Sequence, residues 1–202
     1  MKRLGRLALA AALLVPAGIA VSTGAGAVGP SATCSGGLAG TVGIAPGLKL
    51  VARQSQALSI ANATQSVCSG GYVTAGVVKT QALFPLKTAA VNCQNLLNGI
   101  ATKTPLWSGR IQATWTAPPG MGKTVAAISA YVTSSVGTST SFHFSGNVIP
   151  GGNLFTHGHV SGNFTIDKGL NSTAATPAGS CSLLNPITGA NITASSLKIT
   201  TP

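Results

Sequence analysis

The sequence almost lacks acidic side chains. Asp167 is the single Asp or Glu among 202 residues, against twelve Lys and Arg. Hydrolysis by a pair of carboxylates needs one acid and one base, so this composition excludes it. A Ser-His-Asp triad would have to use Asp167, which lies eight residues from His159 along one predicted strand. At a rise of about 3.3 Å per residue, this carboxylate is too far away to orient the imidazole. No nucleophile elbow, P-loop or dinucleotide fingerprint occurs, and we predict that the protein is not an enzyme.

Charged helix-forming residues are equally scarce, and no long pattern with a period of 3.6 residues appears. Short segments rich in Thr, Val, Ser and Gly recur between turn residues, a spacing that predicts β-strands. The fold class expected is all-β, a two-sheet immunoglobulin-like sandwich that is mostly antiparallel. The one helical candidate, residues 89–100, is expected to form one or two turns at most. The predicted strands are residues 38–51, 57–67, 72–84, 109–117, 124–134, 139–149, 154–167 and 192–200.

The first residues carry the pattern of a secretory signal peptide. Three basic residues precede an apolar run at 7–21, and Ala25-Gly26-Ala27 supplies a small-residue cleavage site. We therefore predict a signal peptide at residues 1–27 and a single secreted β-sandwich domain at 28–202. We expect no transmembrane segment after cleavage, and a location outside the cell or at the cell envelope.

The chain contains four cysteines, which in an exported protein indicate two disulfides. A hairpin register that pairs Val42 with Ile60 also brings the first two cysteines level with each other. This favours Cys34–Cys68 and leaves Cys93–Cys181. Metal binding by these cysteines is not expected, because the spacing of zinc ligands is missing.

A Gly-rich segment late in the chain alternates apolar with polar residues on both sides of a Pro-Gly-Gly turn. Pairing Val148 with Leu154 across this turn places His143 opposite His159, with His157 on the same face. Three imidazoles so arranged could bind zinc or copper, or they could be ordinary histidines of a solvated face. A metal site at these histidines is the only cofactor that the sequence suggests.

The basic residues are scattered singly and form no run, which indicates a diffuse positive field. The function expected first is association with an anionic cell-envelope polymer or another extracellular macromolecule through this basic surface. Specific recognition of nucleic acid is not expected. A blander interpretation is that the charge only keeps the protein soluble.

Few aromatic residues are present, and they suggest an alternative function as a carbohydrate- or ligand-binding module. Trp107, Trp115, Tyr72 and Tyr131 could stack against sugar rings. Trp115 alternates in phase with Ile111 and is expected in the core. Trp107, placed just before a predicted strand, is the expected surface residue and the candidate for ligand binding.

Several short motifs follow one another along the predicted mature chain: a Cys near its start, Gly-Thr-Val-Gly-Ile-Ala-Pro-Gly-Leu, a second Cys, Ile-Gln-Ala-Thr-Trp and a Gly-rich late hairpin. Together they resemble secreted proteins of actinobacteria. The resemblance implies export from a Gram-positive-type cell and an immunoglobulin-like β-domain. It implies no activity and no functional residues.

Overall fold

The computed structural model of the chain describes residues 31–35, 40–48, 57–70, 73–85, 91–170 and 187–202. The predicted signal peptide and Cys181 lie outside these ranges. Within them the chain forms eleven strands and one helix, so the all-β prediction is confirmed. The elements are β1 Ser31–Ser35, β2 Thr41–Leu48, β3 Ala57–Ala61, β4 Ala63–Gln65, β5 Val67–Gly70, β6 Ala75–Pro85, α1 Cys93–Thr102, β7 Trp107–Ala117, β8 Gly122–Val136, β9 Ser139–Ile149, β10 His159–Ile166 and β11 Ile187–Thr200.

All eleven strands belong to one antiparallel sheet, in the order β10-β9-β8-β7-β6-β3-β2-β11-β1-β5, with β4 paired to β6. Strand β10 pairs with β9 on one side and with β11 on the other, so the sheet curls back on itself and is nearly barrel-shaped. Because the sheet is continuous, the predicted division into the two sheets of an immunoglobulin-like sandwich is not confirmed.

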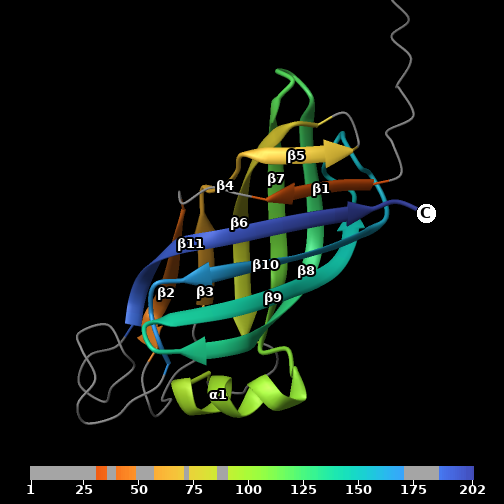
Figure 1. Cartoon of the computed structure of the whole chain (residues 1–202). Helices are drawn as coiled ribbons and strands as arrows, with labels where there is room; N and C mark the ends of the chain where they lie inside the picture. Colours follow the sequence, from red (N-terminus) through yellow and green to blue (C-terminus); the bar gives the residue numbers. More distant parts are fainter. Residues whose placement is uncertain (1–30, 36–39, 49–56, 71–72, 86–90, 171–186) are drawn as a thin grey trace, which may run out of the picture.

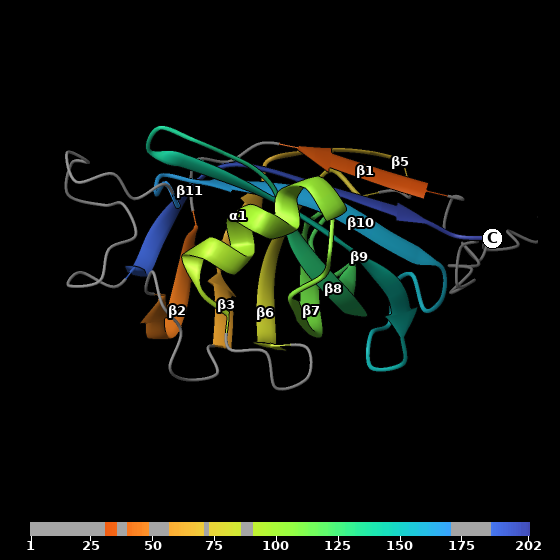
Figure 2. The ribbon, with the colours of Figure 1, turned by 90° about the horizontal axis from the view of Figure 1, so that it is seen from below.

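The curled sheet forms two layers whose strands cross each other. Strands β9, β10 and β11 run across the front of β6, β7 and β8 in Figure 1, and Figure 2 shows the same strands from below as two layers. Alternating side chains from both layers fill the space between them with apolar residues.

Helix α1 lies at one end of the two layers (Figure 2) and buries Cys93, Leu96 and Gly99. The side chain of Asn92 caps its first turn by accepting a hydrogen bond from the Asn95 backbone N–H at 2.6 Å. These contacts stabilise ten residues of helix, more than the one or two turns that the sequence predicts. No helix in the described ranges has the length and apolar character needed to span a membrane.

The aromatic core fixes how β9 pairs with β10. Phe142 lies opposite Phe164, and their rings stack with centroids 4.7 Å apart. The predicted register, with Val148 opposite Leu154, is therefore wrong by four residues, although it keeps the same side chains inside. The reason is the connection between the strands: Leu154 is buried outside the ladder, so β10 begins only at His159.

Trp115 anchors that connection. Its ring meets Phe155 edge-on with centroids 5.7 Å apart, and its indole N–H donates to Thr124 Oγ1 at 2.9 Å. The Thr124 hydroxyl in turn donates to the backbone carbonyl of Leu154. The prediction that Trp115 belongs to the core is confirmed, and its partners explain why this connection is longer than a hairpin turn.

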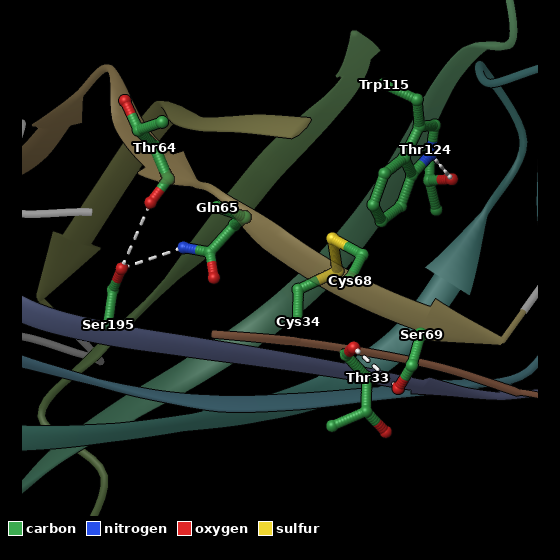
Figure 3. Close-up of a disulfide and its surroundings, with 9 residues drawn as sticks. All are labelled: Thr33, Cys34, Thr64, Gln65, Cys68, Ser69, Trp115, Thr124 and Ser195. Atoms are coloured by element: carbon green, nitrogen blue, oxygen red, sulfur yellow. Dashed lines mark hydrogen bonds between the residues drawn. A yellow bond between two sulfur atoms is a disulfide. The ribbon is translucent and has the colours of Figure 1, made fainter. Parts of the chain in front are cut away.

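The predicted disulfide Cys34–Cys68 is present (Figure 3). The register of β2 and β3 pairs Val42 with Ile60 as predicted. Cys34 and Cys68 are direct partners in the β1–β5 ladder, with Cα atoms 4.0 Å apart. Strand β1 itself is absent from the strands that the sequence predicts. Cys93 is disulfide-bonded too, but its pairing with Cys181 stays a prediction because Cys181 lies outside the described residues.

Removing the first disulfide should destabilise the fold. The bridge closes a separation of 34 residues, so the double substitution Cys34→Ala/Cys68→Ala should cost about 3–4 kcal/mol of unfolding free energy. Thermal unfolding followed by circular dichroism should show a Tm lower by roughly 10 °C. Ser69→Ala, on the same strand, is the matched control and should leave Tm almost unchanged; an equal Tm for the double variant and the original chain would contradict the prediction.

Candidate binding site on the outer face of the sheet

The three histidines do not form the predicted cluster. His143 lies opposite Asn163 and His159 opposite Asn147, which separates the two histidines by four residues along the paired strands, or about 13 Å. His157 precedes β10 and is not part of the ladder. Within the described ranges, no three His, Cys, Asp or Glu side chains are placed to hold a metal ion together. The predicted cluster depended on a register of β9 and β10 that differs by four residues from the observed one, so the histidines that it placed together lie apart.

Each histidine instead has a polar neighbour. His143 Nδ1 lies 3.0 Å from Asn163 Oδ1, and His159 Nδ1 lies 3.4 Å from Asn147 Oδ1. His157 Nδ1 lies 3.3 Å from the hydroxyl of Thr156. Two of these contacts join β9 to β10 on the outside of the sheet, so these imidazoles contribute to cross-strand pairing.

Trp107 is fully buried, so its predicted place on the surface is wrong. Strand β7 begins at Trp107 and not two residues later, which puts this side chain in phase with Ile111 and Trp115 on the inner face. Its ring lies 6.2 Å from that of Phe142. A ligand site built on Trp107 is therefore not available.

The interior cavity lined by described residues beside Gln65 is too small for a ligand. This cavity beside the buried Gln65 measures about 10 Å³, which suits one water molecule. Gln65 Nε2 donates to Ser195 Oγ at 2.8 Å, and this contact links β4 to β11 (Figure 3). Gln65 Oε1 has no hydrogen-bond partner among the described residues. These contacts belong to the closure of the sheet.

The outer face of β7, β8, β9 and β10 is covered by polar side chains in register. Four serines on successive strands are direct cross-strand partners, and we call them the serine ladder: Ser108, Ser129, Ser145 and Ser161. Neighbouring strands lie about 4.8 Å apart, so the ladder repeats its hydroxyl groups at that spacing. All four side chains are half-buried, with the remainder open to solvent.

Different chemistry borders the ladder on its two sides. On one side lie Arg110 and Asn147, which pair with Ala127 between them. On the other side lie Tyr131 and His143, whose ring centroids are 5.1 Å apart. The serines thus run between a cationic and amide border and an aromatic border.

A shallow hollow of about 590 Å³ lies over this part of the sheet. Gly146, one of its lining residues, allows β8 and β9 to approach closely, because a Cβ there would overlap the carbonyl oxygen of Ala127. A second hollow, of about 480 Å³, lies further along β7 beside Lys123. The polar residues lining the first hollow are Ser108, Arg110, Ser129, Ser145 and Asn147.

The serine ladder is the feature that sequence reasoning missed. Alternation already placed Ser145 and Ser161 on a solvent-facing side of predicted strands. Their alignment with Ser108 and Ser129 depends on the registers of three strand pairs, and the one register predicted in this region was wrong. Only the pairing in the structure brings the four hydroxyls into one row.

The sole carboxylate, Asp167, has a structural partner. Its Oδ1 accepts from the Asn191 backbone N–H at 2.8 Å and its Oδ2 from Asn191 Nδ2 at 2.7 Å. Burial raises the pKa of Asp167, but the two hydrogen bonds from Asn191 and the charge of Lys168 outweigh burial and lower that pKa below its usual value. The carboxylate thus joins the end of β10 to β11.

Stability should fall in acid through Asp167. Because the pKa is lower in the folded chain than in the unfolded chain, the stabilisation is present above the unfolded value, about 3.9, and is lost as the pH falls through the folded value. The Tm of the original chain should be constant from pH 7 to about pH 5 and then decrease. In Asp167→Asn this decrease should be much smaller; identical Tm profiles for the two proteins would contradict the role of Asp167.

Comparison of the chain with protein-family models, curated proteins and solved structures finds no match. The resemblance to secreted actinobacterial proteins stays a prediction.

Proposed function

We propose that the protein is a non-catalytic, exported β protein that binds an anionic polymer of the cell envelope, or another anionic extracellular macromolecule. The observation that carries this proposal is the continuous polar face across β7–β10, with Arg110 on its border. Asp167, the sole acidic side chain, is held by Asn191 at the end of β10. An approaching anion thus meets hydrogen-bond donors and a positive charge.

The charge of the whole chain favours the same class of partner. Without Lys2, Arg3 and Arg6 of the predicted signal peptide the formal net charge is 12 − 3 − 1 = +8, which attracts polyanions over distances set by the ionic strength. Arg110 is exposed, and its planar guanidinium can pair with a carboxylate or a phosphate through two parallel hydrogen bonds. The attraction is long-range, while the polar face supplies short-range contacts.

The form of the site suits a polymer better than a small metabolite. Sites for small molecules are usually concave and mostly apolar, so that they surround the ligand. The hollow over the serine ladder is shallow and open to solvent, so it cannot surround a small ligand, and a separate hollow lies further along the sheet beside Lys123. A chain molecule gains affinity by repeating weak contacts over such a surface.

The covalent structure is compatible with export. Disulfides such as Cys34–Cys68 persist mainly in oxidising compartments outside the cytosol. The signal sequence proposed for residues 1–27 leads to the same location.

Carbohydrate binding is a second candidate function, now supported by a different aromatic residue. Tyr131 is half-buried on the outer face, and its ring lies beside the imidazole of His143. A pair of rings at a polar surface can stack against the apolar face of a sugar. This candidate uses the same face of the sheet as the first.

Co-sedimentation of the purified protein with envelope fractions tests the proposed function. Binding should be strong near 0.01 M salt and should disappear near 1 M salt, where charges are screened within about 3 Å. Arg110→Gln should weaken binding several-fold. Lys103→Asn, which removes an equal charge from the left-handed C-cap of α1, is the matched control and should bind like the original chain. Absence of binding at low salt would refute the proposal.

A further inference from the structure

We infer that the polymer is an acidic polysaccharide, and that its chain lies across the strands along the serine ladder with about one sugar residue for each strand. This inference rests on the proposed function and specifies the ligand class and its direction. Ser108, Ser129, Ser145 and Ser161 define the path.

The spacing of the ladder is the first argument. Cross-strand neighbours in a sheet are about 4.8 Å apart, close to the length that one sugar ring occupies in an extended polysaccharide. Each ring carries several hydroxyl groups that donate and accept hydrogen bonds, as a serine hydroxyl does. A chain running perpendicular to the strands therefore meets a new serine with each new sugar, whereas a chain running along one strand does not.

The ladder hydroxyls also lack side-chain hydrogen-bond partners among the residues that the structure describes, which is the second argument. Elsewhere on the same strands, hydroxyl groups pair with each other: Ser141 Oγ lies 2.9 Å from Thr165 Oγ1, and Ser135 Oγ lies 3.0 Å from Thr140 Oγ1. No side-chain hydrogen bond within the described part of the chain engages the four ladder hydroxyls. Their donors and acceptors are free for a ligand.

The borders of the ladder supply the third argument. Tyr131 follows Ser129 by two positions on β8, so its ring borders the path and can contact the apolar face of a sugar. Arg110 follows Ser108 by two positions on β7 and can bind a carboxylate on a sugar at that end. The hydroxyls, the ring and the guanidinium together match an acidic sugar chain.

A linear polyphosphate fits the same surface less well. Each phosphate in such a chain carries negative charge, and a matching site would present a cation at every repeat. Arg110 borders the ladder at one end and Lys198, the cross-strand partner of Ser161, lies at the other end, so the serines between them have no cation at each repeat. Lys123 lies four residues from the position level with Arg110, about 13 Å along the strands. Polyphosphate is therefore expected to bind only through the general charge of the chain.

Calorimetric titration with defined oligomers tests the inference. The probes are galacturonate and hyaluronate oligomers of one to eight sugars, with linear polyphosphates of similar length. Affinity for at least one sugar series should increase with length up to about four sugars, one for each ladder strand, and then level off. The inference would be overturned if neither sugar series bound the protein. It would also be overturned if polyphosphates and sugars of equal charge bound with equal affinity. Salt-sensitive binding to envelope fractions would still uphold the proposed function in that case.

Substitutions on the ladder provide an independent test. Ser129→Ala and Ser145→Ala should each weaken binding of the best oligomer by roughly three- to ten-fold, because each removes one hydrogen bond. Ser139→Ala, an exposed serine on β9 about 20 Å from Ser145 along the strand, is the matched control. All three variants should keep the original Tm. Unchanged affinity in the ladder variants, or an equal loss in Ser139→Ala, would overturn the inference.

Discussion

Closure of the sheet between β10 and β11 is the constraint on which the other features depend. Through it the strands become two facing layers, and the apolar side chains of both layers can leave water together. Asp167 and Asn191 reinforce this junction at one end, and Gln65 with Ser195 links β4 to β11. Without closure, β10 would be an edge strand with one side of its backbone unpaired.

The inner packing also decides what the outer face presents. Stacking of Phe142 on Phe164 sets the register of β9 and β10. That register places Ser145 beside Ser161 on the other side of the same strands. The alignment of the serine ladder is thus determined by apolar packing on the opposite face of the sheet. A change in that packing that shifted the register would also shift the serines.

Much of the local structure could be predicted from the sequence, because side-chain alternation reports directly on burial in a strand. Residues 139–149 form a strand with the bounds expected, and the predicted register of β2 and β3, with Val42 opposite Ile60, was sufficient to select Cys34–Cys68. Long-range arrangement could not be predicted. Whether strands form one sheet or two depends on pairings such as β10 with β11, between segments separated by a connection with little periodicity.

At the candidate site, too, local alternation was predicted correctly but the placement of individual side chains was not. The prediction for His143 and His159 failed because residues 150–158 contribute buried side chains, such as Leu154, where a short turn was expected. The prediction for Trp107 failed because β7 starts two residues earlier than expected, so Trp107 lies within the strand on the same inner face as Ile111. An error of this size has little effect on the fold class, but it is decisive for a binding surface.

The position of β11 has a consequence for the order in which the chain can fold. This strand pairs with β1, β2 and β10, so two strands from the start of the sequence meet the last strand described. Contacts that span most of the chain form slowly, because a large loop must close before they are made. β1 and β2 therefore remain without this partner until residues 187–200 arrive, whereas β6 to β10 each pair with the next strand in the sequence and can form hairpin by hairpin. The two halves of the sheet are thus expected to fold in a definite order, with closure last.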